Sequence, residues 1–373
     1  MKKRLIILGC TGSIGTTALS IISEHPELFE VVGLSAHRNV DNLFKVAASY
    51  PEAVTALTGA EHPDADYCGQ SGLIDMIKET DADMVLHGIT GASGLNYSIA
   101  SLKHGKDLAL ANKESVVMAG SLLFDLARHH GRTIVPVDSE HSAIFQLMDH
   151  TPRRIISKVI LTASGGPFRN VPEHRFSQIT PEEALHHPTW KMGPKITIDS
   201  ATLANKGLEV IETSHFFRMN SRDISVVVHP QSLVHSLIET REGSLYAQIS
   251  ATSMKIPILN ALTYPDVVDS CIAPFTLAGK SLTFEEPDYK RFPMLSYAFT
   301  CLEGSSALPI VYNAVNEQAV GAFLNRFITF TDISRLVGDA LTKQWPGRVS
   351  SFDEVLEIDR AARSAADEAI QRI

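Results

Sequence analysis

The sequence contains few cysteines, and those that it has form no recognisable pairs. Cys10, Cys68, Cys271 and Cys301 are spread over 373 residues, and no two of them make a CxxC motif. Zinc knuckles and disulfide frameworks both need closely spaced cysteines, so neither is expected. A reducing compartment fits this pattern best, and we expect a cytoplasmic protein.

Long apolar runs and long basic runs are also absent. No apolar run approaches the roughly 18 to 20 residues that a transmembrane helix needs, and residues 5–8 are too few for the core of a signal peptide. The longest basic run is residues 2–4, and the formal net charge is -9. A nucleic-acid-binding surface needs far more positive charge. We therefore expect neither a membrane nor a nucleic-acid partner.

The length and the rhythm of apolar runs predict an α/β protein with several domains. A chain of 373 residues exceeds one ordinary domain. Up to about residue 150, β-rich runs alternate with helix-like segments near 41–49, 95–104 and 115–129, which is typical of a doubly wound, mostly parallel Rossmann-like sheet. We predict a nucleotide-binding domain (1–150), a mixed α/β catalytic domain (151–263), a proline-containing linker (264–292) and a helical C-terminal domain (293–373).

Three local patterns refine this expectation. A helix is predicted from about Thr202 to Phe217. Residues 223–251 contain three β-like runs separated by short turns, which indicates antiparallel neighbours. Ser351 followed by Glu354 predicts a capping box at the start of the last helix.

A glycine-rich turn follows the first predicted strand. Residues 9–15, GCTGSIG, would let the backbone approach a pyrophosphate, whose charge the N-terminus of the next helix would stabilise. The spacing is GxxGxxG, and a plain tight turn is the alternative. Its position at the start of a βαβ unit favours a dinucleotide site.

The end of the second predicted strand bears on the choice of cofactor. NAD-binding proteins usually have an acidic residue there for the ribose hydroxyls, but this chain has Ser35 to Asn39 with Arg38 in the middle. A basic side chain suits a 2'-phosphate, so NADP is favoured. A solvated loop arginine is the alternative.

Two acids close a short apolar run at residues 133–137. Asp138 and Glu140 point the same way in an extended segment and lie at the carboxyl end of a strand, where α/β sheets bind ligands. Two neighbouring carboxylates favour a hard cation, Mg²⁺ or Mn²⁺. The alternative is that Asp138 or Ser139 only caps the following helix.

A second polar group lies on the predicted helix after residue 202. Asn205, Lys206 and Glu209 share one helical face, and Glu209 is the candidate third metal ligand. A surface salt bridge is the alternative.

Several further donors suit a phosphate group. Ser164 with its glycine turn, Ser200, Asn205 and Lys206 offer hydroxyl, amide, backbone and ammonium donors. Residues 186–194 read as a mobile lid, with a packed surface loop as the alternative.

Seven motifs, in order along the chain, resemble the 1-deoxy-D-xylulose 5-phosphate reductoisomerase family. They are GCTGSIG (9–15), ANKES (111–115), VDSEHSAIFQ (137–146), TASGGPFR (162–169), HPTWKMG (187–193), DSATLANKGLE (199–209) and HPQSLVHS (229–236). The resemblance implies an enzyme that uses NADPH and Mg²⁺ or Mn²⁺ to isomerise and reduce a small phosphorylated sugar. It also implies a bacterial, cytoplasmic homodimer that binds phosphonate hydroxamate inhibitors.

The resemblance also implies roles for single residues. Metal ligands would be Asp138, Glu140 and Glu209. Catalytic residues would be Lys113, Glu140, His187 and Glu209. Substrate contacts would be Lys113, Ser139, Glu140, Ser164, His187, Ser200, Asn205, Lys206 and Glu209, with Trp190 and Met192 on the closing loop and His235 nearby. NADPH contacts would be Thr11, Gly12, Ser13, Ile14, Arg38, Asn39, Asn112, Glu114 and Gly193. His37 departs from the smaller residue expected in many relatives, which leaves the detail of adenosine binding open.

Two other classes of protein share part of this pattern. A dehydrogenase of the aspartate-semialdehyde type would have the glycine turn but needs a catalytic cysteine, and none of the four cysteines lies in a turn flanked by likely partners. A non-catalytic NADP sensor would need the turn and Arg38 but not the three acids.

Overall fold

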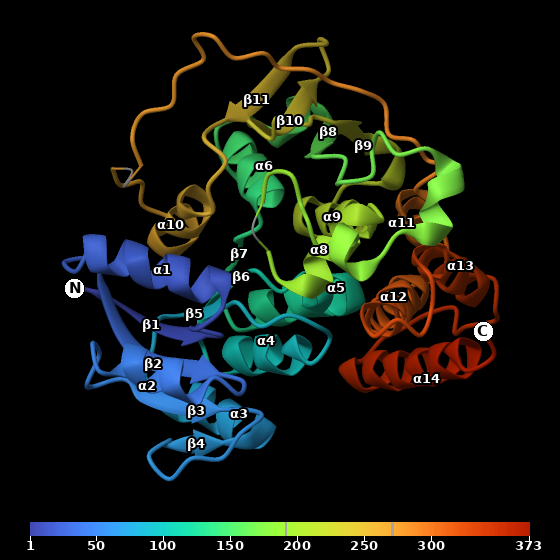
Figure 1. Cartoon of the computed structure of the whole chain (residues 1–373). Coiled ribbons are helices and arrows are strands. Elements are labelled where there is room, and N and C mark those ends of the chain that lie inside the picture. Colours follow the sequence, from blue (N-terminus) through green and yellow to red (C-terminus); the bar gives the residue numbers. More distant parts are fainter. Residues whose placement is uncertain (191, 270–271) are drawn as a thin grey trace. The chain divides into compact units, whose positions relative to one another are not determined.

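The β-rich runs of the first 137 residues form one parallel sheet in the computed structural model, which describes residues 1–190, 192–269 and 272–373 (Figure 1). Its seven strands follow the order β4-β3-β2-β1-β5-β6-β7. The order reverses at β1, which confirms the predicted doubly wound arrangement. The strands are β1 (Lys3–Leu8), β2 (Phe29–Ala36), β3 (Val54–Leu57), β4 (Tyr67–Cys68), β5 (Met84–His87), β6 (Asp107–Leu110) and β7 (Ile134–Pro136).

The centre of this sheet is covered on both faces. Residues 5–8 of β1 are fully buried in succession, as expected for a central parallel strand. The predicted helices near 41–49, 95–104 and 115–129 are present, whereas β3, β4 and α3 were not predicted because their apolar runs are short. The helices are α1 (Ser13–Glu24), α2 (Val40–Ala47), α3 (Gly69–Glu79), α4 (Gly94–Lys103), α5 (Lys113–His129), α6 (Ser139–Asp149) and α10 (Lys255–Thr263), which packs on α1.

A second sheet has four strands in the order β11-β10-β8-β9. They are β8 (Ile156–Ala163), β9 (Ile224–Val228), β10 (Val234–Thr240) and β11 (Leu245–Ile249). The predicted antiparallel pairing is correct for β10 and β11. It is wrong for β9, which pairs in parallel with β8. Strand β8 ends at Ala163, well before β9 begins at Ile224, and it lies between β9 and β10 in the sheet. The turn residues within 223–251 carry no information about a strand that lies outside that range.

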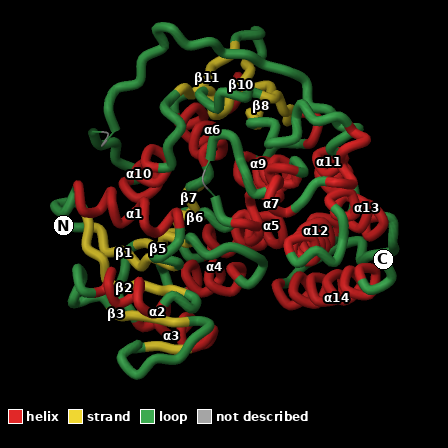
Figure 2. Tube along the Cα trace, in the orientation of Figure 1, coloured by secondary structure: helices red, strands yellow, loops and turns green. Residues whose placement is uncertain are grey.

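The remaining elements around the second sheet are mostly helical (Figure 2). Leu203, with φ of 60°, separates two of the helices, so the one predicted from about residue 202 begins at Ala204. The α-helices are α7 (Pro181–Ala184), α8 (Pro194–Ala201), α9 (Ala204–Phe217), α11 (Pro293–Glu303), α12 (Leu308–Leu324), α13 (Phe330–Leu341) and α14 (Phe352–Ile370). Three short 3-10 helices are η1 (Arg153–Ile155), η2 (Glu173–Gln178) and η3 (Ser221–Asp223).

The predicted capping box at the last helix is only half correct. The Ser351 side chain accepts a hydrogen bond from the Glu354 amide at 3.2 Å. The Glu354 carboxylate, however, accepts from the amide of Ser350 at 2.7 Å. The reciprocal contact is therefore shifted by one residue.

The backbone forms two compact units. Unit 1 contains residues 1–115, 123–142 and 253–275, and unit 2 contains residues 116–122, 143–252 and 276–373. Helices α5 and α6 contribute to both. The sequence-based boundaries at 150, 263 and 292 stay a prediction. Within the described ranges, no helix combines the length and the apolar character needed to cross a bilayer.

Candidate active site

The glycine turn after β1 is tightly packed in unit 1. Gly9 adopts φ of 77°, and a Cβ atom on Gly15 would lie 2.4 Å from the carbonyl oxygen of Gly9. Only glycine fits at position 15, because the backbone atoms of Gly9 and Cys10 leave no room for a side chain there. The turn delivers Gly12 as the N-cap of α1, so Thr11, Ser13 and Ile14 stand at a helix N-terminus suited to a phosphate.

The end of β2 lies beside this turn. The Ser35 hydroxyl oxygen accepts a hydrogen bond from the Gly9 amide at 3.2 Å. Arg38 follows on the exposed surface, and Asn39 caps α2 through the Asn42 amide at 3.4 Å. The predicted cofactor residues of β1 and β2 are thus adjacent at the carboxyl ends of neighbouring strands.

His37 is accommodated by a glycine elsewhere in the unit. Its Nδ1 atom lies 2.9 Å from the Thr58 hydroxyl. A Cβ atom on Gly59 would lie only 2.1 Å from the imidazole ring. The larger side chain at position 37 therefore depends on the absence of one at position 59.

Asn112 and Glu114 belong to one buried hydrogen-bond network. Asn112 caps α5 by accepting from the Ser115 amide at 2.9 Å. Its Nδ2 group donates to Glu114 at 3.0 Å and to the carbonyl oxygens of Ile89 and Gly91 at 2.9 and 3.0 Å. These contacts tie the β6–α5 junction to the loop after β5.

His87 is a residue of this region that the sequence analysis missed. Its Nδ1 accepts from the Ile89 amide at 3.3 Å, so its Nε2–H donates to the Gly94 carbonyl at 2.9 Å. The ring is fully buried, and burial lowers its pKa to about 4. His87 therefore holds residues 88–94 as a neutral imidazole. The glycine-containing run GITGASG, residues 88–94, directly follows a strand, and this pattern in the sequence could have indicated the turn that His87 holds.

This shift predicts acid sensitivity. The folded-state pKa of about 4 lies below the unfolded value of 6.5, so the unfolded chain binds the proton first and stability is lost as pH falls from about 6.5 to about 4. The loss should reach about 3 kcal/mol for His87. Thermal unfolding between pH 7 and 4 should show a smaller decrease for His87→Gln than for the wild type. An identical decrease would contradict the assignment. His215, whose pKa burial also lowers to about 4, supplies a separate contribution.

The carboxylates after β7 form a compact polar group in unit 1. Asp138 forms an ion pair with Lys113, whose side chain is also buried. Asp138 and Glu140 each offer a carboxylate oxygen within 4.8 Å of the other, and Ser139 donates to Glu140 at 2.5 Å. The capping alternative is confirmed, since Asp138 accepts from the Glu140 amide at 3.1 Å. Asp138 uses one oxygen to start α6 and presents the other to Lys113.

The second acidic group is on α9 in unit 2. Glu209 is fully buried. It accepts from Asn205 Nδ2 at 2.6 Å and forms an ion pair with Lys206. The predicted common face is confirmed, and the exposed salt bridge is excluded, because Lys206 is also buried.

Ser164 and Ser200, two of the predicted phosphate contacts in unit 2, lie close to the turn after β8. Ser164 Oγ lies 3.0 Å from Nε2 of His187 and accepts from the Gly166 amide at 3.3 Å. Gly166 has φ of 67°, and a Cβ there would lie 2.6 Å from the Ser200 carbonyl oxygen. Ser164 and the end of α8 are thus close neighbours.

The tautomer of His187 follows from its hydrogen bonds. Its Nδ1 accepts from the amides of Thr189 and Trp190 at 3.1 and 2.9 Å. Nε2 therefore carries the proton and donates to Ser164. Burial lowers the pKa of His187, so the ring is neutral. The Ser164 hydroxyl, which accepts both bonds, keeps its own proton for a ligand.

Between α7 and α8, residues 185–190, 192 and 193 have no regular secondary structure, and residue 191 lies outside the described residues. The ring of Trp190 is half-buried, with its centroid 6.5 Å from that of His235. Gly193 is the N-cap of α8. The segment is thus anchored at its C-terminal end by the helix that carries Ser200.

Two of the three described cysteines are buried and poorly suited to act as nucleophiles. Burial raises the pKa of Cys10 to about 12 and raises that of Cys301 strongly, so neither thiol ionises near neutral pH. Cys68 is half-buried at the start of α3, and Cys271 lies outside the described residues. Cys10 and Cys301 therefore do not fit the catalytic cysteine of the semialdehyde-dehydrogenase alternative.

Comparison with known proteins decides the family. Models described as 1-deoxy-D-xylulose 5-phosphate reductoisomerase and as its C-terminal domains match residues 5–120, 134–217 and 249–365. The chain belongs to this family. Two reductoisomerases of that name, from Burkholderia mallei (strain SAVP1) and Burkholderia pseudomallei (strain 668), are each 44% identical over 98% of this chain and 96% of their own length.

Solved structures of reductoisomerases share the fold. A structure in complex with NADPH, fosmidomycin and magnesium has a TM-score of 0.91 and 36% identity, covering 99% of this chain and 98% of that one. The enzyme from Zymomonas mobilis in complex with NADPH has a TM-score of 0.91 and 37% identity, covering both chains completely.

Proposed function

We propose that this reductoisomerase-family chain converts 1-deoxy-D-xylulose 5-phosphate to 2-C-methyl-D-erythritol 4-phosphate and oxidises NADPH. The substrate's C3–C4 bond breaks in a retro-aldol step, the fragments rejoin as a branched aldehyde, and hydride from NADPH reduces it. Residues 1–150 would bind NADPH and residues 151–263 would hold the substrate, with residues 293–373 as a helical domain joined through 264–292.

The proposed metal ligands are Asp138, Glu140 and Glu209. All are hard oxygen donors, which suit Mg²⁺ or Mn²⁺. The fit is supported by the cations already beside them, Lys113 at Asp138 and Lys206 at Glu209, because a region that gathers carboxylates needs compensating positive charge. When bound, the metal ion supplies Lewis-acid stabilisation of the negative charge that develops on the substrate oxygens.

The chain's own side chains account for binding and water exclusion. Ser164, Ser200, Asn205 and Lys206 would hold the phosphate, with His187 as a neutral donor beside Ser164. Lys113, which forms an ion pair with Asp138, would polarise a substrate oxygen or relay a proton, and Ser139 would orient Glu140. The segment around Trp190 and Met192 would close over the substrate and exclude water from the reactive fragments.

Glu209 carries the proposal. A fully buried carboxylate that faces Asn205 and Lys206 is costly to keep for stability alone, and it is expected where a cation and an anionic substrate meet.

Product identification is the direct test. Purified protein supplied with NADPH, Mg²⁺ and 1-deoxy-D-xylulose 5-phosphate should yield the branched tetrol phosphate, which carbon NMR separates from any linear sugar. A linear reduced product would show ketone reduction without rearrangement and would refute the proposal, as would full activity in the presence of a chelator.

Three further properties are proposed from the same family membership. The chain should accept Mn²⁺ as well as Mg²⁺, bind phosphonate hydroxamates such as the fosmidomycin seen with a related enzyme, and act as a homodimer in the bacterial cytoplasm.

A further inference from the structure

Helix α12 carries none of the predicted site residues, yet it contacts both helices of unit 2 that do. Asn316 donates from Nδ2 to Asp199 Oδ1 on α8 at 2.7 Å. Tyr312, one helical turn earlier, has its hydroxyl 3.4 Å from the Ala204 carbonyl oxygen at the start of α9. Residues i and i+4 share a face, so one face of α12 meets the α8–α9 junction. The predicted phosphate contacts on either side of this junction are Ser200, Asn205 and Lys206.

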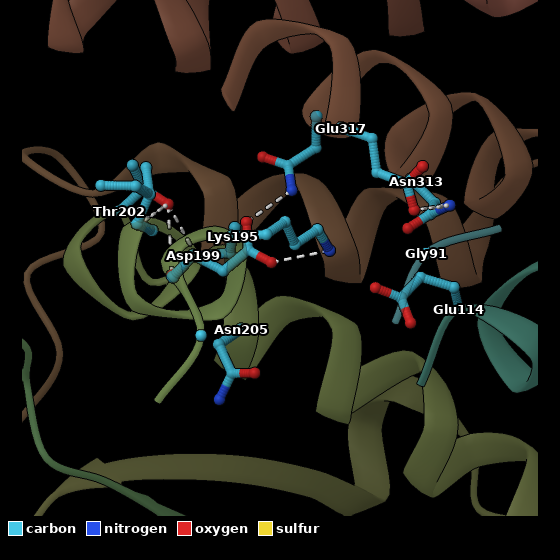
Figure 3. A network of polar contacts seen from close by, with 12 residues as sticks. Gly91, Glu114, Lys195, Asp199, Thr202, Asn205, Asn313 and Glu317 are labelled. Carbon is cyan, nitrogen blue, oxygen red and sulfur yellow. Dashed lines mark hydrogen bonds and ion pairs between the residues drawn. The ribbon is translucent and has the colours of Figure 1, made fainter. Parts of the chain in front are cut away.

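Asp199 is the buried charge in this contact. Its carboxylate is 1% exposed. Lys195 Nζ lies 2.8 Å from its Oδ2 (Figure 3). Asn316, itself fully buried, donates to its Oδ1. A buried carboxylate is strongly unfavourable unless it is paired and hydrogen-bonded. A displacement of α8 would separate Asp199 from Asn316 and leave it only Lys195, which lies on the same helix, so the contact between Asp199 and Asn316 holds α8 against α12.

The junction itself leaves little freedom. The Thr202 hydroxyl donates to the Asp199 carbonyl oxygen at 3.2 Å and accepts from the Ala204 amide at 3.3 Å. A Cβ atom on Gly207 would lie 2.4 Å from the Tyr312 hydroxyl, so α9 and α12 approach closely. A displacement of α8 would therefore be transmitted to the first turn of α9.

Helix α12 is in turn braced by the last helix of the chain. Glu317, next to Asn316, accepts from Arg363 of α14 at 2.5 Å. Arg363 also donates to Asp359 at 2.8 Å within α14. Polar contacts thus join α12 to α14 at Glu317 and to α8, the helix that carries Ser200, at Asn316.

We propose that Asp199 and Asn316 are positioning residues for the phosphate group of the substrate. They act through Ser200, the neighbour of Asp199 in sequence, by holding α8 where its last turn packs on the Ser164–Gly166 turn. That packing tolerates no added atom at Gly166, as described above. The C-terminal helices therefore set the affinity for the phosphorylated end of the substrate. This inference rests on the proposed function.

The test is a kinetic comparison of Asp199→Asn, Ser200→Ala and the double variant. Asp199→Asn keeps the shape of the side chain but removes the negative charge that Lys195 and Asn316 contact. We expect KM for the sugar phosphate to rise about 10-fold with a smaller change in kcat and an unchanged Kd for NADPH. If Asp199 acts through Ser200, the double variant should raise KM little beyond the larger single effect. Additive effects would overturn the proposal.

Asp332→Asn is the control, because Asp332 is a half-buried aspartate paired with a basic residue, Arg335, on its own helix α13, outside the contacts that join α12 to α8 and α14. It should lower Tm without raising KM. If it raised KM as much as Asp199→Asn does, the effect of Asp199→Asn would be explained by general destabilisation of the fold.

If Asp199→Asn fails to fold, Lys195→Met provides the same readout from the partly exposed partner. KM should rise for Lys195→Met and recover in Lys195→Arg, and an unchanged KM would overturn the proposal. Turnover by the wild type tests the proposed function separately, so the two failures remain distinguishable.

Discussion

Replacing Glu209 with glutamine should reduce kcat by at least about 100-fold, because a charged group that supports developing charge in a buried site is worth at least that much. Glutamine keeps the size of the side chain and can still accept from Asn205, but it loses the negative charge that a divalent cation needs. NADPH affinity should be unchanged, since the glycine turn belongs to the other unit. Steady-state kinetics and fluorescence titration with NADPH measure the two quantities.

Magnesium dependence separates loss of a ligand from loss of fold. The Glu209→Gln enzyme should need a higher Mg²⁺ concentration for its residual activity, while circular dichroism stays close to that of the wild type. Glu239→Gln is the control, because Glu239 is a half-buried acid on β10 that accepts from a serine hydroxyl, as an ordinary structural carboxylate does. Wild-type turnover and magnesium dependence in Glu209→Gln would remove Glu209 from the metal site.

Replacing Arg38 with alanine should weaken NADPH binding by about 10- to 150-fold and leave NADH binding nearly unchanged. The range follows from about 1.5 to 3 kcal/mol for a hydrogen bond to a charged group. Arg38 is exposed, and its guanidinium group forms no hydrogen bond or ion pair with the residues that the structure describes. The substitution should therefore change cofactor choice without lowering Tm.

Lys45→Ala controls for the general effect of removing a positive charge. Lys45 is an exposed cation on α2, the helix that follows Arg38. Its loss should affect NADPH binding only slightly and in a salt-dependent manner. Equal losses for NADPH and NADH in Arg38→Ala would show that the arginine does not recognise the 2'-phosphate.

Local motifs were the part of the site that the sequence predicted best. The positions of Asn205, Lys206 and Glu209 on one helical face follow from 3.6 residues per turn, and their hydrogen bonds confirm it. The sequence predicts Asp138 and Glu140 as metal ligands, with a helix cap as the alternative. Asp138 caps α6 with its Oδ1 atom, while its Oδ2 atom faces Lys113. The cap is a fact of the structure, whereas the metal role stays a proposal.

Contacts between distant segments were beyond the sequence. The pairing of β9 with β8 and the contact of Asn316 with Asp199 join residues whose partners no local pattern identifies. Gly59 illustrates the same point, since its small size matters only because His37 fills the space beside it.

The sequence by itself determined the doubly wound class, the glycine turn and the residue types of the candidate site, because periodicity, turn chemistry and motif order act over a few residues. Only the tertiary structure decided which carboxylates are buried, which histidine is held neutral and which helix fixes α8. Burial and pairing depend on the atoms that close around a side chain, and some of those atoms come from distant segments, as with Asp199 and Asn316, which are 117 residues apart.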